Sequence, residues 1–344
     1  MTSTTAGPTQ STTIQEVAVD NESTVEPLRR GDLVVGVDGS PASRSALRFA
    51  AVEARLRGDT LVVLTATVGA ALAGAVTEAA SAPIEGMSSV MTGLMAPVVH
   101  TALHHFPAPV DLARDLGQAM VDEELGAAPR VTVRVEPYDG RPAEALVERS
   151  GSADLVVVGA RGQGGLGFGS VADQVRRHAS CTVVVVPGTS APAGAEAAEK
   201  PHPVVVGVDG SPGGRRALRF AGREARLRAT GLVVVAAYHP SDRVELEDGV
   251  GAHEPPGPGS QPARTRAGIE QMIAEEPDAA TVDADLVVEP GHPANVLLDT
   301  VRRIDGSLLV VGSRGLGGFA GLLLGSVGEA VSRHAPCPVA VVRP

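Results

Sequence analysis

The stretch VVGVDGSP occurs twice in this chain, at residues 34–41 and again, 171 residues later, at 205–212. Each copy is followed by a helix-like run, SRSALRFAAVEARLRG at 43–58 and GRRALRFAGREARLRA at 214–229. In both runs Ala, Leu and Phe recur at helical spacing, which predicts an amphipathic helix with Arg and Glu on its outside. A strand, a glycine turn and a helix therefore open two related halves of the chain.

Further matches between the halves follow in the same order. VVGARG at 157–162 corresponds to VVGSRG at 310–315, and RHASCTVVVV at 177–186 corresponds to RHAPCPVAVV at 333–342. The offsets between the copies differ, so the first copy has 18 more residues in its middle and three fewer in its late loop. Two copies that differ by bounded insertions predict two domains of one fold.

The domain boundaries follow from composition. We assign the two domains to 31–188 and 203–344, and a linker to 189–202, which is small, polar and proline-containing. Residues 1–30 are polar and rich in Ser and Thr, which predicts a disordered tail.

Apolar β-branched runs alternate with helix-like segments in each copy. LVVGVD, LVVLTA and DLVVVGA each contain a continuous apolar run rather than an alternating one, which is typical of parallel strands covered on both faces. The predicted class is therefore α/β, with two tandem Rossmann-like sandwiches, each built on a five-stranded parallel sheet.

Composition limits the functions that the chain can have. The net charge of −11 and an aromatic content of 2% argue against nucleic acid, which favours basic surfaces with aromatic stacking platforms. Two cysteines make no disulfide framework, and the N-terminus has no signal-peptide layout, so we expect a cytoplasmic protein. Residues 60–77 carry no charge, as a short membrane span would, but the repeat favours a strand there and predicts no membrane contact.

Two loops of each copy fall at the carboxyl ends of strands, where ligands bind in such sheets. One is VDGS, which carries Asp38 and Asp209. The other, in the second copy, is GSRGLGGFAGLLLGS at 312–326, which leads into a helix. Backbone N–H groups at a helix start bind anions, and Arg314 could supply the positive charge that a lysine supplies in many phosphate loops. Together the loops predict a phosphate site.

With these motifs, the sequence resembles the universal stress protein family. The spacing Gly312-x2-Gly315-x9-Gly325-Ser326 matches the nucleotide motif of that family. VVVGVDGSPGGRRALRFA, GHPANVLL and SRHAPCPVAVVR are similar to its usual opening, third-strand exit and ending. The resemblance covers both copies.

The resemblance implies a nucleotide site, because some members of the family bind ATP at these loops, although others do not. It implies that Asp209 contacts the ribose or base side and that the backbone at Ala237 meets the adenine. It also implies a group that surrounds the ribose and phosphates: Gly312, Gly315, Gly325, Ser326 and Val327. The expected cofactor is ATP, with or without Mg²⁺.

The first copy departs from the motif. It reads Gly159-x2-Gly162-x6-Gly169-Ser170, and three fewer residues remove up to about 10 Å of loop contour. Asp38 and Ala66 remain, but nucleotide binding at this copy stays open. We therefore predict one strong ATP site per chain, in the second copy.

Two features outside the motif have alternative interpretations. Met87, Met91 and Met95 recur every four residues before Pro97, as one helical stripe that serves either core packing or an interaction surface. Many members of the family are homodimers, so we expect the two copies to pair within the chain, with 182–186 and 338–342 as contact edges. A homodimer of the chain is the alternative.

The sequence favours a non-catalytic, nucleotide-binding stress or regulatory protein. ATP hydrolysis needs a positioned water, a base and usually a metal, and nothing in the sequence converges with Asp209 to supply them. The alternatives are an ATP-hydrolysing or nucleotidyl-transferring enzyme, and a nucleotide-free scaffold.

Overall fold

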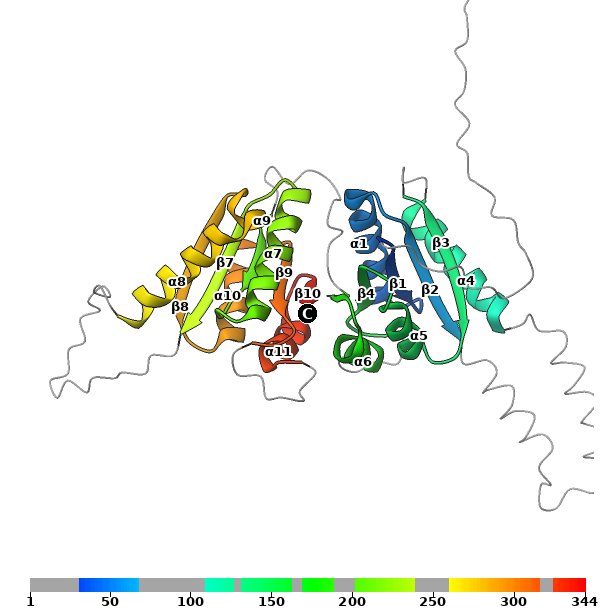
Figure 1. Cartoon of the computed structure of the whole chain (residues 1–344). Coiled ribbons are helices and arrows are strands. Elements are labelled where there is room, and N and C mark those ends of the chain that lie inside the picture. Colours follow the sequence, from blue (N-terminus) through cyan, green and yellow to red (C-terminus); the bar gives the residue numbers. More distant parts are fainter. Residues whose placement is uncertain are drawn as a thin grey trace, which may run out of the picture.

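The computed structural model describes residues 31–67, 109–126, 131–162, 169–188, 202–238, 260–315 and 324–344. Within them ten strands form one sheet in the order β3-β2-β1-β4-β5-β10-β9-β6-β7-β8 (Figure 1). We call residues 31–188 domain 1 and residues 203–344 domain 2. The predicted tail, most of the predicted linker and the methionine stripe at 87–95 lie outside the described residues.

The described elements of domain 1 alternate between strands and helices. They are β1 (Leu33–Val37), α1 (Pro41–Arg57), β2 (Leu61–Thr67), α4 (Pro109–Leu125), β3 (Val133–Asp139), α5 (Pro142–Arg149), β4 (Leu155–Gly159), α6 (Ser170–His178) and β5 (Thr182–Val186). Its five strands are parallel, in the order 3-2-1-4-5.

Domain 2 repeats this order of elements. They are β6 (Val204–Gly207), α7 (Pro212–Leu227), β7 (Leu232–Tyr238), α8 (Gln261–Glu275), α9 (Pro277–Ala280), β8 (Ala284–Pro290), α10 (Pro293–Ile304), β9 (Leu308–Gly312), α11 (Ser326–His334) and β10 (Val339–Val342). Its strands are also parallel, so the predicted fold class is confirmed.

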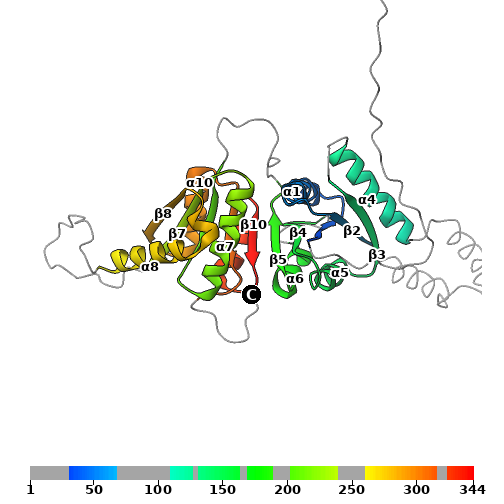
Figure 2. The same ribbon diagram turned by 45° about the horizontal axis from the view of Figure 1, so that its top comes forward.

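Helices cover both faces of the sheet. Figure 2 shows α1 and α4 above the strands of domain 1 and α5 and α6 below them. One apolar core lies under α1, α4, α7, α8 and α9 and runs through both domains. Separate cores lie under α5 and α6 and under α10 and α11. The inner strands are almost wholly apolar because they pack against helices on both faces, whereas the edge strands β3 and β8 carry charged residues and are half-buried or exposed.

The two domains meet at their last strands. β5 and β10 pair antiparallel, with Val184 opposite Ala340 and Val183 opposite Val341. These are the strands that the sequence indicated as contact edges. The pairing leaves neither strand with an unpaired edge in the sheet, which protects them from pairing with other chains.

Helices α1 and α7 also meet at this junction, through four charged side chains that we call the buried quartet: Glu53, Arg57, Glu224 and Arg228. Arg57 pairs with Glu224, and Arg228 pairs with both Glu53 and Glu224. Glu53 is 1% exposed and Glu224 is fully buried. The prediction that Glu lies on the outside of these helices is therefore wrong, because the other domain covers that face.

Each of the two arginines of the quartet also lies near a phenylalanine ring of the other domain. The Arg57 guanidinium lies 5.7 Å from the ring centre of Phe220, and that of Arg228 lies 5.9 Å from the ring centre of Phe49. The positions in the two helices differ by the 171 residues of the repeat. Each domain therefore presents the same surface to the other, as in an isologous dimer.

The quartet predicts a dependence of stability on pH. Burial raises the pKa of Glu53 to about 7, Arg228 and Arg57 oppose the rise, and Glu224 adds to it. A carboxyl group whose pKa is higher in the folded state than in the unfolded state stabilises the fold at low pH and loses that contribution as pH rises. We expect urea midpoints to fall between about pH 4.5 and pH 7 through this group, and Glu53→Gln to flatten that slope. An unchanged slope in Glu53→Gln would contradict the assignment.

A second set of ion pairs joins α6 and α11 across the same junction. Arg177 lies 3.4 Å from Glu329, and Arg333 lies 3.9 Å from Asp173. These helices follow the two glycine-rich loops, so the ion pairs connect the segments that end the two candidate sites.

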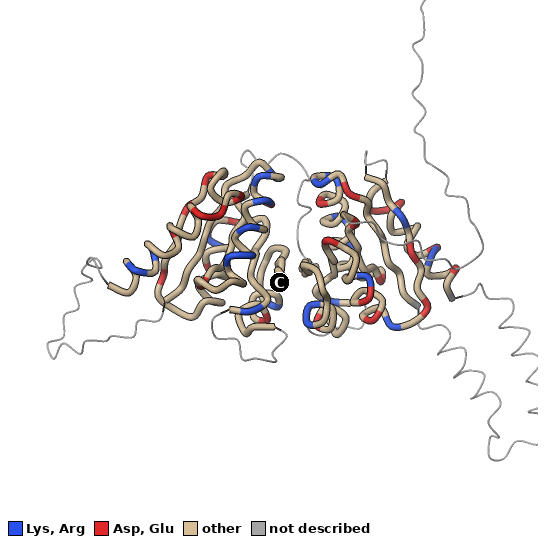
Figure 3. Tube along the Cα trace, viewed as in Figure 1, with Lys and Arg blue, Asp and Glu red and all other residues tan. Residues whose placement is uncertain are grey.

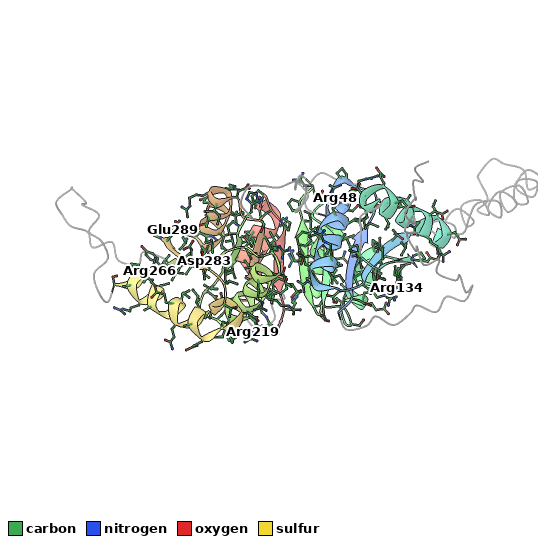
Figure 4. The ribbon with its side chains drawn as sticks, turned by 90° about the horizontal axis from the view of Figure 1, so that it is seen from above. Arg48, Arg134, Arg219, Arg266, Asp283 and Glu289 are labelled. Carbon is green, nitrogen blue, oxygen red and sulfur yellow. The ribbon has the colours of Figure 1, made fainter. Side chains whose placement is uncertain are left out.

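Ion pairs also attach the first helix of each domain to its neighbour. Arg48 of α1 pairs with Glu124 of α4, and Arg219 of α7 pairs with Glu276, which precedes α9. Figure 4 labels Arg48 and Arg219 on opposite sides of the molecule, as the repeat requires.

Basic and acidic residues are interspersed along both domains (Figure 3). None of the described helices is long and apolar enough to span a membrane.

Candidate functional site

The first loop of each candidate site is a tight turn after the first strand. Oδ1 of Asp209 accepts a hydrogen bond from the Ser211 backbone N–H at 3.0 Å, and Oδ1 of Asp38 accepts one from Ser40 at 3.0 Å. Gly210 has φ +82°, a conformation that favours glycine. The turn fixes each aspartate at the carboxyl edge of the sheet, where the sequence placed it.

The helix that follows each turn has a side-chain N-cap. Ser211 accepts a hydrogen bond from the Gly214 N–H at 3.0 Å, and Ser40 accepts one from Ser43 at 3.2 Å. A serine at this position followed by proline is a helix start signal. The caps hold the backbone of α7 and α1 close to the glycine-rich loops.

The glycine-rich loop and the aspartate meet directly in both domains. A methyl group on Gly315 would overlap Oδ2 of Asp209, and one on Gly162 would lie 2.8 Å from Oδ2 of Asp38. A side chain at either position would therefore displace the carboxylate from its observed place. The structure brings together the two loops that the sequence singled out separately.

The glycine that ends the fourth strand packs on the helix start. A methyl group on Gly312 would lie 2.9 Å from the carbonyl carbon of Gly213, and one on Gly159 would lie 2.7 Å from that of Ala42. Only a residue without a side chain lets the strand end approach the helix backbone in this way. These two glycines therefore fix where each loop begins, close to the start of the helix.

The far end of the loop returns to the strand and starts a helix. Gly325 donates a backbone hydrogen bond to Ser313 at 2.8 Å, and Gly169 donates one to Ala160 at 2.9 Å. Gly325 is the N-cap of α11 and offers no side-chain cap. Backbone N–H groups at the start of α11, with Ser326 exposed and Val327 half-buried, therefore lie at the sheet edge, in an arrangement suited to an anion. In domain 1 the exposed Ser170 starts α6 in the same way.

Ala237 and Ala66 lie near the ends of β7 and β2, next to β6 and β1 respectively. Both are half-buried and pack against the apolar cores under α10 and α5. They therefore lie at the same carboxyl edge as Asp209 and Asp38, one strand away.

Positive charge gathers at the domain 2 loop. Arg314 is exposed directly after β9, and Arg343 follows the neighbouring strand β10. Burial, followed by the charges of Arg314 and Arg176, lowers the pKa of Arg343. Arg343 donates a hydrogen bond to the Arg176 backbone carbonyl at 2.5 Å, so it also ties domain 2 to α6.

Two cysteines and two histidines lie near the ends of the helices that follow the loops. Burial raises the pKa of the Cys181 and Cys337 thiols to about 12, which keeps them protonated. His178 and His334 lie in the last turns of α6 and α11. Residues 163–168 and 316–323, the middle of each loop, lie outside the described residues. Among the described side chains no group of three or more His, Cys, Asp or Glu could hold a metal ion.

Sequence reasoning missed one part of the site. Gly213 faces the loop and Gly214 faces the aspartate turn, whereas domain 1 has Ala42 and Ser43 at these positions. The signal was present as a difference between two otherwise similar copies, PGG against PAS after the serine. The consequence of this difference depends on the position of the Arg314 carbonyl, which no sequence pattern gives.

Comparisons with known proteins place the chain among relatives of the same length. A universal stress protein of Mycobacterium tuberculosis (strain H37Rv) is 32% identical over 330 residues, which cover 90% of this chain and 96% of the relative. One of Mycolicibacterium smegmatis is 34% identical over 321 residues, which cover 91% of this chain and 97% of the relative.

Solved structures and the family pattern agree with these relatives. A universal stress protein from Archaeoglobus fulgidus has the same fold, with a TM-score of 0.57 over 91% of this chain and 98% of that chain, at 17% identity. The pattern of the universal stress protein family matches residues 30–187 and 201–343. This chain therefore belongs to the universal stress protein family and carries two of its domains in tandem.

Proposed function

We propose that this protein binds ATP, with or without Mg²⁺, at one competent site in domain 2 and acts as a non-catalytic stress or regulatory protein in the cytoplasm. The observation that carries the proposal is the contact between the Asp209 carboxylate and Gly315, which joins the aspartate turn to the start of the glycine loop. An aspartate beside glycine backbone and a helix N-terminus is a combination suited to a ribose and its phosphates.

Membership of the family supports the same proposal, because it implies ATP binding at these loops in some members. The three-residue difference in loop length supports a single site, since the shorter loop presents fewer backbone N–H groups to a triphosphate. A loop whose six residues are half glycine also loses more conformational entropy when it orders around a ligand.

We further propose that the two domains act as a pair within one chain. The antiparallel pairing of β5 with β10 and the buried quartet support this arrangement. A homodimer through another surface is compatible with it. Neither nucleic acid nor a membrane is part of the proposal.

Mass spectrometry of the freshly purified, denatured chain tests the proposed ligand. We expect released adenine nucleotide at about one mole per mole of chain, or uptake of one ATP by nucleotide-free protein. A chain that neither releases nor takes up nucleotide would favour the scaffold alternative. Steady phosphate release from ATP with Mg²⁺ would favour the ATP-hydrolysing alternative, for which Asp209 is the proton acceptor that the described residues bring to the loop.

A further inference from the structure

The start of the first helix differs between the two domains at two positions. Domain 1 has Pro41 followed by Ala42 and Ser43, whereas domain 2 has Pro212 followed by Gly213 and Gly214. The rest of the turn is the same, with an aspartate, a glycine and a capping serine in each. The difference therefore lies in the first turn of the helix, where residue 213 faces the glycine-rich loop and residue 214 faces the aspartate turn.

In domain 1 serine side chains occupy this space. The Asp38 backbone N–H donates to Oγ of Ser43 at 3.3 Å, and that hydroxyl donates to the Ser40 carbonyl at 3.0 Å. Oγ of Ser40 donates to the Arg161 carbonyl at 3.2 Å, so the loop is held by the helix cap.

In domain 2 the loop occupies the space itself. A methyl group on Gly213 would overlap the carbonyl oxygen of Arg314, and one on Gly214 would lie 2.9 Å from Oδ1 of Asp209 and 3.2 Å from its backbone nitrogen. Arg314 can follow its observed path only because residue 213 has no side chain, whereas residue 214 faces the aspartate turn and not the loop. The loop path in domain 2 is thus incompatible with an alanine at position 213, the residue that domain 1 carries there as Ala42.

We propose that Gly213 is a specificity-determining positioning residue, which sets the loop path at Arg314 and so confines ATP to domain 2. This inference rests on the proposed function and adds a cause for the asymmetry besides loop length. It assigns to the helix start a role that the nucleotide motif does not include.

The test rebuilds the helix start of domain 1 in domain 2. Gly213→Ala/Gly214→Ser introduces residues that the same fold already carries at 42 and 43, so the full chain is expected to fold. We expect ATP affinity to fall at least tenfold by calorimetry, while adenosine affinity changes less than threefold, because the displaced loop holds phosphates. A general loss of domain 2 structure would weaken both ligands equally.

Two controls accompany the variant. Gly268→Ala on α8 adds a methyl group with no atom within 4 Å, and Ala42→Gly/Ser43→Gly changes the other domain. Both are expected to keep wild-type ATP affinity. If the double variant fails to fold, Gly213→Ala is measured in the same way.

The outcomes separate the two proposals. Wild-type ATP affinity in the folded variant, or an equal loss for ATP and adenosine, would overturn the inference and leave the proposed function standing. Absence of ATP binding by the unmodified chain would overturn the proposed function and this inference with it.

Discussion

Glu224→Ala is expected to lower the free energy of unfolding by about 3–5 kcal/mol, the cost of removing one partner from a buried ion pair. Glu224 is fully buried and pairs with Arg57 and Arg228, which would be left with Glu53 as the remaining carboxyl group of the quartet. Because Arg57 belongs to the other domain, we expect the substitution to destabilise the junction between the domains as well as α7. Urea unfolding followed by circular dichroism measures it.

Two control variants distinguish a lost partner from a lost side chain. Glu275→Ala removes a carboxylate that is 46% exposed and pairs with Arg215 at the surface, and we expect a change below about 1 kcal/mol. Replacing all four quartet residues with leucine removes the charges together, which in buried ion pairs is often neutral or stabilising. A change below about 1 kcal/mol for Glu224→Ala would show that the quartet is not buried in solution.

Gly315→Val is expected to abolish most ATP binding, at least a hundredfold in affinity, and leave the fold intact. Its side chain would overlap Oδ2 of Asp209 and force the aspartate or the loop away from the observed position. Residue 315 is exposed, so the apolar cores do not depend on it. Calorimetry measures the affinity, and thermal unfolding with saturating ATP measures the lost stabilisation, which is roughly 2.7 kcal/mol at about 100 times the dissociation constant.

Gly162→Val is the matched control because it places a side chain against the equivalent atom, Oδ2 of Asp38, in the other domain. We expect it to change ATP binding by less than twofold. Comparable losses in the two variants would mean that both domains bind nucleotide. Full binding by Gly315→Val would mean that the loop holds no phosphate.

Much of the fold could be predicted because the chain repeats. Continuous apolar runs such as Leu155–Gly159 indicated parallel strands that are buried on both faces. The alternation of these runs with helix-like segments indicated a doubly wound sheet. The carboxyl-edge position of Asp209 and Gly312 then followed from topology, since parallel strands end at the same edge. That Asp209 touches Gly315 is a distance, which only the structure gives.

The junction shows where sequence reasoning failed. Helical periodicity identifies an apolar face and assigns charged residues such as Glu53 and Glu224 to solvent. It does not register that a second domain covers that face and supplies a matching arginine. Phe, Glu and Arg repeated at four-residue steps in both helices were the available sign of a shared interface.

Titration of nucleotide-free, full-length protein with ATP in an isothermal calorimeter tests the central claim most directly. We predict one strong site per chain, which Gly315→Val removes and Gly162→Val retains. Two equivalent sites, or no heat of binding at ATP concentrations up to the millimolar range, would contradict it.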